Sequence, residues 1–390
     1  MKRRTFLMTA GAAARALAAD MPRVGVIGSG GRGRLLTSEF KEIGAQMTAV
    51  CDVYQPNLEA GLQQASTGAK PYGDYRRMLD DRSIDAVIIT TPDHWHAQMT
   101  IDAAQAGKDM YVEKPMCHLP DEGFRMVEAV RRHKRVCQVG TQRRSGSLFL
   151  EIKNKYARPD VLGDVRLVNS WWINYQDRLS QAQLRGDLDW KQWLGPAPQR
   201  PFDQARFFNW LHYHDYSGGI FVGQAAHAVD CIQWYMNSPM PAAVTCAGGQ
   251  MNLGGGEIPE TASMTVEYPE NYIAVFTLGY KAMRYNTHND QMNHYHGTKA
   301  RLDVGRESYA LWPQSAEVKI APSVQDAKVG SFVVATREHI RNFLDCIVSR
   351  KDPTATVEAG LGTSISLAMA MESLRKGRRI KWDAAAKKMV

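Results

Sequence analysis

Short, almost wholly apolar segments recur through the first 145 residues, and helical patterns separate them. Uninterrupted apolar runs of this length are typical of strands buried on both faces of a parallel sheet. Strands that alternate with helices at short intervals predict a parallel, doubly wound sheet, an α/β Rossmann-type domain. The predicted strands are 23–28, 47–52, 84–92, 109–115 and 136–140, and the clearest helices are 95–106 and 120–133.

The pattern changes near residue 145. Apolar and polar residues alternate in segments such as TASMTVEY and YIAVFTL, which is typical of antiparallel strands with one buried face. These segments fall within 161–175 and 240–320, and helical patterns over 337–350 and 357–377 close the chain. The second domain is therefore expected to be α+β, with an open, mostly antiparallel sheet covered by helices. The segment HNDQMNHYHG, residues 288–297, is interpreted as a loop at the sheet edge.

Composition excludes several classes of protein. The chain has 48 Lys and Arg against 40 Asp and Glu, a net charge of +8, but no long basic run follows the N-terminus. A nucleic-acid partner is therefore not expected. No run of 18 apolar residues occurs, so a membrane partner is not expected either. The six cysteines include no CxxC pair, which argues against a zinc ribbon or a redox dithiol, and a disulfide framework is not expected.

The first twenty residues form a separate part of the chain. Lys2, Arg3 and Arg4 precede a short apolar run that ends in Ala-Leu-Ala, the pattern of an export signal. RRTFL resembles a twin-arginine signal, which directs folded proteins across a membrane. Arg15 inside the apolar run favours instead an irregular basic N-terminus of a cytoplasmic protein. We expect residues 1–20 to be a signal for the periplasm or another exported location, 21–145 the dinucleotide-binding domain and 146–390 a domain for substrate binding and oligomerisation.

A glycine-rich loop, Gly28-Ser29-Gly30-Gly31-Arg32-Gly33, follows the first predicted strand and opens a predicted helix. This context distinguishes a dinucleotide fingerprint from an ordinary glycine-rich turn. The first glycine permits the tight turn, the second permits close approach to the pyrophosphate, and the third permits helix–sheet packing. The helix N-terminus then directs free N–H groups at the phosphates. The loop therefore predicts a bound NAD or NADP.

Asp52 ends the second predicted strand, 24 residues beyond Gly28 (52 − 28). An acidic residue in this place accepts hydrogen bonds from the ribose hydroxyls of NAD and repels the 2′-phosphate of NADP. NAD is therefore preferred. Arg32 and Arg34 leave NADP open, because an arginine can hold that phosphate.

Two further motifs, TTPDHWHA at 90–97 and YVEKP at 111–115, carry a family resemblance. With the glycine loop, they make the chain similar to the Gfo/Idh/MocA family, named for glucose–fructose oxidoreductase and inositol dehydrogenase. VGTQRRSG at 139–146 and WLGPAP at 193–198 resemble the exported branch of that family. The resemblance covers nearly the whole chain after residue 20. It implies an NAD(P)-dependent oxidoreductase, commonly an oligomer built on the open sheet, here a dimer or tetramer.

The resemblance also implies roles for single residues. Lys114 would bond the reacting hydroxyl and His227 would be the general base. The residues expected near the cofactor are Thr91, Pro92, His96, Glu113 and Gln142, and Arg143 is expected at the substrate or nicotinamide. Lys114 is plausible on physical grounds as well, because doubly wound sheets bind ligands at the carboxyl ends of their strands and a cation stabilises a developing alkoxide.

One position departs from the family pattern, in which an Asp precedes the histidine by four residues. Here that position is Gly223. Three explanations remain open: Asp215 or Asp230 takes over, His227 works without an orienting carboxylate, or the chemistry has moved away from simple dehydrogenation.

Aromatic residues between 171 and 216 are candidates for stacking on a sugar, although a core role is equally consistent with each. The expected substrate-binding residues are Arg143, Trp172, Tyr175, Tyr213, His214, Asp215 and His227. His212, His214 and His227 lack a further ligand at convincing spacing, so no metal site is expected.

The leading hypothesis is an enzyme that transfers hydride to or from a secondary hydroxyl of a sugar, cyclitol or glycoside. The alternative is a redox-neutral enzyme, a hydrolase or lyase, that cleaves a glycoside through a keto intermediate and returns the hydride. Export favours that alternative, because free NAD is scarce outside the cytoplasm and a tightly bound cofactor would be recycled. A sensor that only binds a dinucleotide or sugar would not require Lys114.

Overall fold

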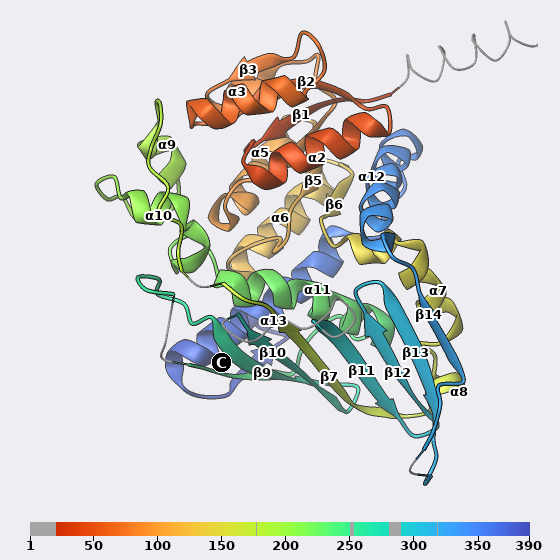
Figure 1. The fold of residues 1–390 in the computed structure, drawn as a ribbon. Coiled ribbons are helices and arrows are strands. Elements are labelled where there is room, and N and C mark those ends of the chain that lie inside the picture. Colours follow the sequence, from red (N-terminus) through yellow and green to blue (C-terminus); the bar gives the residue numbers. More distant parts are fainter. Residues whose placement is uncertain (1–20, 177, 250–252, 281–289, 318) are drawn as a thin grey trace, which may run out of the picture.

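The computed structural model describes residues 21–390 except 177, 250–252, 281–289 and 318. Two β-sheets organise this part of the chain, one in each half (Figure 1). Residues 1–20, the expected signal, and His288 lie outside the described residues. The six cysteines are free and buried.

The first sheet is parallel, with strand order β3-β2-β1-β4-β5-β6, which confirms the predicted doubly wound sheet. Its strands are β1 (Arg23–Ile27), β2 (Gln46–Cys51), β3 (Lys70–Tyr72), β4 (Ala86–Ile89), β5 (Asp109–Val112) and β6 (Cys137–Val139). The helices between them are α2 (Gly31–Glu42), α3 (Gln55–Gln64), α4 (Tyr75–Asp80), the 3-10 helix η1 (Asp93–Trp95), α5 (His96–Gln105) and α6 (Pro120–Arg132). Chain order reverses between β1 and β4, the place where such sheets bind nucleotides.

The second sheet has ten strands in the order β14-β13-β12-β11-β7-β10-β9-β8-β15-β16. All pairs are antiparallel except β7 with β10, so the mostly antiparallel expectation is confirmed. The strands are β7 (Val165–Ile173), β8 (Ala243–Gly248), β9 (Thr261–Tyr268), β10 (Tyr272–Gly279), β11 (Gln291–Gly297), β12 (Ala300–Gly305), β13 (Ser308–Pro313), β14 (Val324–Ala327), β15 (Ile380–Asp383) and β16 (Lys388–Met389). Alternate residues of β9 and β10 are buried, so one face of the sheet packs on the core.

Strand β11 corrects one prediction. The segment 288–297 was expected to be an edge loop, yet 291–297 is a strand between β7 and β12, in the middle of the sheet. Its polar sequence hid the alternation: Gln291 and Asn293 are buried, while His294 and His296 are on the other face. Polar side chains on the inner face of a sheet signal a site rather than a loop.

Three long helices, the last three of the chain, connect the two halves. The helices after β6 are η2 (Gln142–Ser145), α7 (Ser147–Lys155), α8 (Pro159–Leu162), α9 (Trp190–Leu194), α10 (Gln204–Phe208), η3 (Trp210–His212), α11 (Gly219–Met236), α12 (Ser331–Ser349) and α13 (Val357–Lys376). Helices α11 and α13 lie between the second sheet and the first domain (Figure 1).

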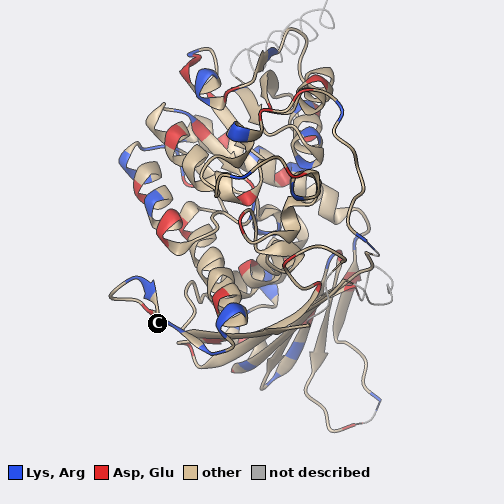
Figure 2. Cartoon of the chain, turned by 90° about the vertical axis from the view of Figure 1, so that its left-hand side faces the viewer, with Lys and Arg blue, Asp and Glu red and all other residues tan. Residues whose placement is uncertain are grey.

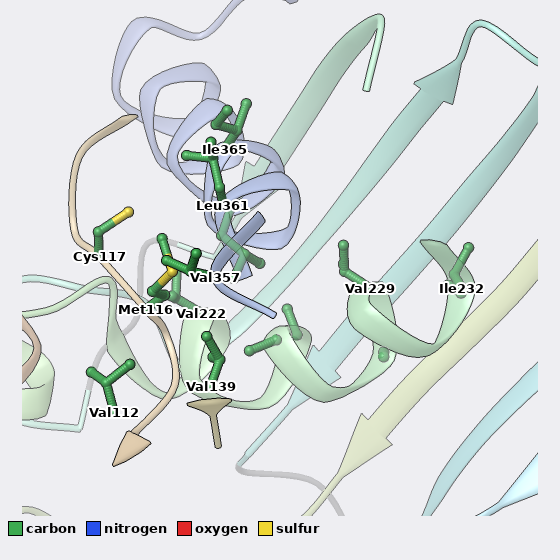
Figure 3. Packing of buried hydrophobic residues seen from close by; sticks show 14 of the residues in the cluster. Val112, Met116, Cys117, Val139, Val222, Val229, Ile232, Val357, Leu361 and Ile365 are labelled. Atoms are coloured by element: carbon green, nitrogen blue, oxygen red, sulfur yellow. The ribbon is translucent and has the colours of Figure 1, made fainter. Parts of the chain in front are cut away.

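The apolar interface between the halves fixes the end of β5 against α11 and α13. Figure 3 shows Val112, Met116 and Val139 of the first domain facing Val222 of α11 and Leu361 of α13. All of these side chains are buried. The interface therefore sets the position of the EKP segment, which follows Val112, relative to α11.

Helix α12 lies within the predicted second domain but covers the first sheet. Phe343 is fully buried, and its ring lies 6.2 Å from that of Phe40 and 6.0 Å from that of Tyr111. Figure 2 shows basic and acidic residues interspersed along the helices, in keeping with the dispersed charges of the sequence. Among the described residues, no helix is long and apolar enough to cross a membrane.

Candidate active site

The glycine loop joins β1 to α2 and leaves an open cradle. Gly28 has φ +86°, and a Cβ there would lie 2.9 Å from the Thr91 nitrogen. A Cβ at Gly33 would lie 2.1 Å from the Gly28 oxygen, whereas Gly30 and Gly31 face open space. These are the roles that a dinucleotide fingerprint requires of its glycines. The residues present therefore fit the pyrophosphate of NAD.

Asp52 lies in the same pocket as Gly28, Thr91 and Pro92. Its carboxylate accepts hydrogen bonds from the backbone nitrogens of Ser29 at 2.8 Å and Tyr54 at 2.9 Å. Burial raises the pKa of Asp52 to about 6 despite these bonds. Its negative charge is therefore present at neutral pH, and it is progressively lost as the pH drops below about 6.

The arginines of the loop are held by protein groups. Arg32 forms an ion pair with Glu113 at 2.8 Å, and Arg34 donates to the carbonyl oxygen of Ser29 at 2.9 Å. The Ser29 hydroxyl donates to the carbonyl of Asn57 at 2.6 Å, so this buried side chain shapes the loop.

A segment of the second domain, residues 184–216, forms the other wall of this pocket; we call it the covering segment. The Tyr54 hydroxyl donates to the Arg185 oxygen at 3.0 Å and accepts from the Arg185 nitrogen at 2.9 Å. Trp95 Nε1 donates to the Trp193 oxygen at 2.8 Å. The side of the pocket formed by the covering segment consists of Gln192, Trp193, Phe207, Phe208 and Trp210. The sequence signalled this segment through WLGPAP and its aromatic residues, but its place over the cofactor pocket was missed.

Lys114 follows β5, where the interface of Figure 3 holds the chain. Its Nζ donates to the Gly223 carbonyl of α11 at 2.9 Å, and its backbone nitrogen donates to Glu113 at 3.2 Å. Burial lowers the pKa of Lys114, while the carboxylates of Glu113 and Asp93 oppose that shift. The predicted catalytic lysine is thus a half-buried amine between the two domains.

His227 lies between two cations along α11. Gly223, His227 and Cys231 are four residues apart, which places them in one row on the helix. Lys114 contacts the first of them, and Arg143 Nη1 lies 3.9 Å from the Cys231 sulphur. Burial and the positive charges of Lys114, Arg143, Arg32 and Arg306 lower the pKa of His227 well below its usual value, so the ring is neutral at pH 7.

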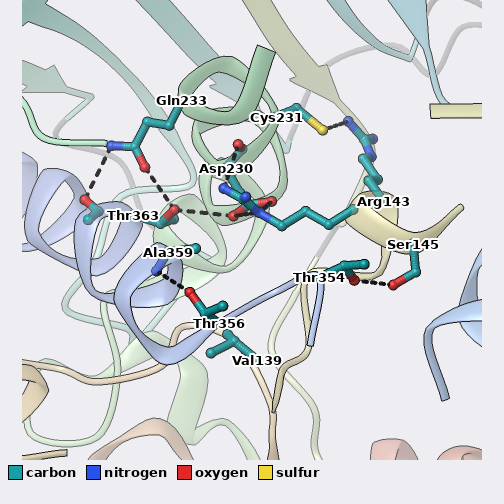
Figure 4. A network of polar contacts seen from close by, with 12 residues as sticks. Val139, Arg143, Ser145, Asp230, Cys231, Gln233, Thr354, Thr356, Ala359 and Thr363 are labelled. Carbon is teal, nitrogen blue, oxygen red and sulfur yellow. Dashed lines mark hydrogen bonds and ion pairs between the residues drawn. The ribbon is translucent and has the colours of Figure 1, made fainter. Parts of the chain in front are cut away.

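Trp172 also reaches this place, because its ring centroid lies 5.8 Å from that of His227. Arg143 donates a further hydrogen bond to Gln291 of β11. Helix η2, which carries Arg143, is anchored by a buried ion pair between Arg144 and Asp230 at 2.8 Å. Figure 4 shows the neighbouring contact of Arg143 with Cys231. The structure therefore brings Lys114, His227, Arg143 and Trp172 together.

The carboxylate missing at Gly223 is not replaced by either predicted substitute. Asp230 is bound to Arg144, and Asp215 forms ion pairs with Arg200 and Arg206. Nδ1 of His227 has no hydrogen-bond partner among the described residues. A Cβ at Gly223 would lie 3.9 Å from Lys114 Nζ, so an aspartate there would stand beside the ammonium.

Two predicted cofactor residues are buried supports. The ring nitrogens of His96 lie 2.7 Å from the Pro115 oxygen and 3.0 Å from the Thr91 oxygen, so His96 joins the EKP segment to the end of β4. Gln142 is buried in η2, and its Oε1 has no partner within the described ranges.

Four predicted substrate residues lie apart from Lys114 and His227. Tyr175 is 53% exposed, and Tyr213 is buried in an aromatic cluster with Arg206 over its ring at 4.3 Å. His214 lines a separate pocket with His118, and Asp215 is held by its arginines. Among the described residues, no hydrogen bond or ion pair joins Tyr213, His214 or Asp215 to Lys114 or His227. Of these four side chains, Tyr213 and Asp215 pack within the covering segment.

No group of three or more His, Cys, Asp or Glu side chains that could hold a metal ion is found among the described residues.

Two family models match this chain. One, described as "Oxidoreductase family, NAD-binding Rossmann fold", matches residues 22–141. The other, "Oxidoreductase family, C-terminal alpha/beta domain", matches residues 197–382. The chain belongs to the Gfo/Idh/MocA oxidoreductase family. In this family the parallel sheet is the NAD-binding domain, which agrees with the cradle around Gly28 and Asp52.

Relatives within the Gfo/Idh/MocA family differ in how much they share. Inositol 2-dehydrogenase of Salmonella typhimurium is 32% identical over 139 residues, 35% of this chain and 40% of that one. The uncharacterized oxidoreductase YrbE of Bacillus subtilis is 26% identical over 375 residues, 93% and 97% of the two chains. Glycosyl hydrolase family 109 protein 1 of Shewanella sp. (strain MR-4) is 30% identical over 155 residues, 37% and 34%. The match to the inositol dehydrogenase thus spans about two fifths of that relative.

Solved structures share the fold across nearly the whole chain. Levoglucosan dehydrogenase, in complex with NADH and levoglucosan, superposes with a TM-score of 0.74 at 16% identity. The superposition covers 92% of this chain and 99% of that one. At this identity the comparison establishes the architecture of the two domains.

Proposed function

We propose that this protein is an NAD-dependent dehydrogenase that oxidises or reduces a secondary hydroxyl of a sugar, cyclitol or glycoside. One observation carries the proposal. Lys114, at the carboxyl end of β5 beside the cofactor cradle, donates to Gly223 of α11, and His227 lies one turn further along the same face of that helix. The names of relatives that act on inositol and levoglucosan support the substrate class.

The residues of the site suit the removal of a hydroxyl proton. The bound nicotinamide would accept or return the hydride. The Lys114 ammonium stabilises the developing alkoxide, and it already donates to a carbonyl oxygen in this place. The neutral His227 ring accepts the proton as the carbon is oxidised to a ketone. Because His227 lacks an orienting carboxylate, Lys114 and the ring of Trp172 are its positioning neighbours.

The test is a single-turnover reduction of bound NAD, followed at 340 nm with a panel of sugars and cyclitols. Lys114→Ala should lower the rate by about 10²–10⁴, the usual contribution of one positioned acid–base group, while NAD still binds. Lys108→Ala, which removes a buried lysine of the same domain far from α11, is the control. Unchanged turnover in Lys114→Ala would refute the mechanism.

For the cofactor, we propose that NAD is preferred to NADP and is retained between turnovers. Asp52 disfavours a 2′-phosphate, and Arg32 and Arg34 are already held by Glu113 and the Ser29 carbonyl. The covering segment supports retention, because its aromatic side chains line the pocket opposite the glycine loop. Mass spectrometry of protein purified without added cofactor and then denatured would detect near-stoichiometric NAD. Empty protein would contradict retention.

Redox-neutral glycoside cleavage remains an outcome of the same assay. Release of free sugar without net NADH would indicate it. The glycosyl hydrolase match covers about a third of each chain, and it does not favour this alternative over a dehydrogenase.

Export and oligomerisation complete the proposal. Export rests on the twin-arginine-like RRTFL sequence, and loss of periplasmic protein in an Arg3→Lys/Arg4→Lys variant would support it.

A dimer or tetramer is proposed through the outer face of the second sheet, and size-exclusion chromatography with light scattering measures that oligomeric state.

A further inference from the structure

Four cations surround His227. Lys114 and Arg143 stand at the two ends of its row on α11. Arg306, in the turn between β12 and β13, stacks on Phe332 with 4.4 Å between its guanidinium carbon and the ring centroid. The Phe332 ring in turn lies 6.5 Å from that of His227. Arg32 is the fourth, and all four charges act on the histidine.

The carboxylates near these cations are largely committed to other groups. Glu113 is paired with Arg32. Asp93 accepts a hydrogen bond from the Ser217 hydroxyl at 2.6 Å, and Glu307 accepts from the backbone at the start of α12. Of the four cations, Arg32 alone has a side-chain carboxylate within ion-pair distance among the described residues. The site therefore holds an excess of positive charge.

Two of the guanidinium groups also have unused donors. Nε of Arg143 and Nε of Arg306 are buried without a hydrogen-bond partner among the described residues. Arg143 is only 4% exposed. A buried cation with unsatisfied donors is costly unless an anion joins it. Arginine binds planar carboxylates through paired N–H donors, so an acidic ligand would satisfy these groups.

The cofactor does not supply that anion at this place. Its pyrophosphate belongs at the N-terminus of α2, beside Gly30 and Gly31. Arg143 and Arg306 are anchored instead by the second domain, at Cys231 of α11 and Phe332 of α12. The absence of a carboxylate at Gly223 is consistent with this excess of positive charge, because an aspartate there would stand beside Lys114 and repel an acidic substrate.

We propose that the substrate of this enzyme is a sugar acid, whose carboxylate binds to Arg143 and Arg306 while its reacting hydroxyl lies at Lys114 and His227. This inference rests on the proposed dehydrogenase function and names the substrate class for it. Uronic and aldonic acids, free or as glycosides, have the required carboxylate and secondary hydroxyls.

The experiment compares matched acidic and neutral ligands on the NAD-loaded protein. The pairs are D-glucuronate with D-glucose, D-galacturonate with D-galactose, and D-gluconate with D-glucitol. Affinity is measured by thermal shift and by calorimetry, so the result does not depend on turnover. At least one acid should bind ten times more tightly than its neutral partner, and the difference should shrink at 0.5 M salt. Equal or weaker binding of the acid in every pair overturns the inference.

Variants locate the charge that gives the preference. Arg306→Gln is the main one, because Arg306 is half-buried and its loss should not prevent folding; Arg143→Gln is the second. Each should reduce the acid preference at least fivefold, whereas Arg306→Lys should keep most of it. Arg132→Gln, on the exposed surface of α6, is the matched control. Loss of preference in the control alone would overturn the assignment.

Two outcomes separate this inference from the proposed function. Oxidation of neutral sugars with no acid preference leaves the dehydrogenase standing and removes the sugar-acid assignment. Acid-selective binding without any reduction of NAD supports the assignment and counts against the dehydrogenase. Tighter binding of D-glucose 6-phosphate than of every acid in the panel would overturn the carboxylate in favour of a phosphate.

Discussion

His227 is neutral because it is buried among cations, and this has a consequence for the pH dependence of the reaction. A general base must be unprotonated, so the rate rises with pH through its pKa. The pKa of His227 lies well below 6.5, and we therefore expect kcat to remain near its maximum as pH falls from 8 to 6. His227→Asn should lower kcat by about 10²–10⁴.

Single-turnover rates across this pH range test the expectation. His296→Asn, on the other face of the second sheet, is the control. A half-maximal rate near pH 6.5 would contradict the assignment of His227 as a neutral base.

Asp52 governs the choice of cofactor through a charge that titrates. With a pKa of about 6, the carboxylate is ionised at pH 8 and largely protonated at pH 5. The preference for NAD over NADP should therefore be greater at pH 8. Two like charges in this partly exposed place cost roughly 1–3 kcal/mol, so Asp52→Asn should improve relative NADP affinity about 5- to 150-fold.

Titration of both cofactors into protein stripped of NAD measures the ratio of their affinities. Glu59→Gln, an exposed carboxylate of α3, should leave that ratio unchanged. A ratio that does not vary with pH would show that another group selects the cofactor.

Sequence motifs located the residues whose role is local. The glycines join β1 to α2, and Asp52 and Lys114 each follow a strand closely, so short motifs placed them. Arg306 was missed, because its place beside His227 depends on a hairpin and a helix that meet only in the folded chain. The ion pairs of Asp215 with Arg200 and Arg206 could not be read from spacing for the same reason.

The covering segment is the element that closes the cofactor pocket. Phe208 of α10 lines the pocket, and its ring packs 6.5 Å from that of Tyr54. Aromatic contacts with a base contribute roughly 1–3 kcal/mol each. Phe208→Ala should therefore speed the loss of NAD about 5- to 150-fold, and stopped-flow dilution into a cofactor trap would measure that rate.

Phe202→Ala is the matched control, because Phe202 belongs to the same segment, is 42% exposed and contacts Trp190 outside the pocket. Equal release rates in both variants would mean that the segment does not retain NAD. The sequence predicted aromatic stacking in this region, but it assigned the rings to the sugar. Nothing local distinguishes a ring that faces a nucleotide from one that faces a substrate.

The stability of the whole molecule depends on the packing of α12, from the second half of the chain, against the first sheet. Phe343→Ala would leave a cavity between Phe40 and Tyr111, at a cost of about 3–5 kcal/mol. Because α12 and α13 both join the two halves, we expect one cooperative unfolding transition with a lower midpoint, rather than two. Chemical denaturation followed by tryptophan fluorescence and by circular dichroism measures this.

Val348→Ala, 71% exposed on the same helix, should be nearly neutral. Separate transitions for the two halves would contradict the prediction. The periodicity of 337–350 predicted this helix correctly but could not tell which sheet it covers. Its apolar side chains, Ile340, Phe343 and Leu344, would suit either one.

Helix α12 also limits how such a chain can exchange parts with its relatives. A crossover at the predicted domain boundary, near residue 145, would deliver a foreign cofactor domain whose surface does not match this α12. Phe343 would then pack against foreign residues in place of Phe40 and Tyr111. A viable transplant must carry 21–145 together with 331–349, two stretches separated by most of the substrate domain. Exchange of residues 21–145 alone would therefore disrupt the packing of α12 on the first sheet.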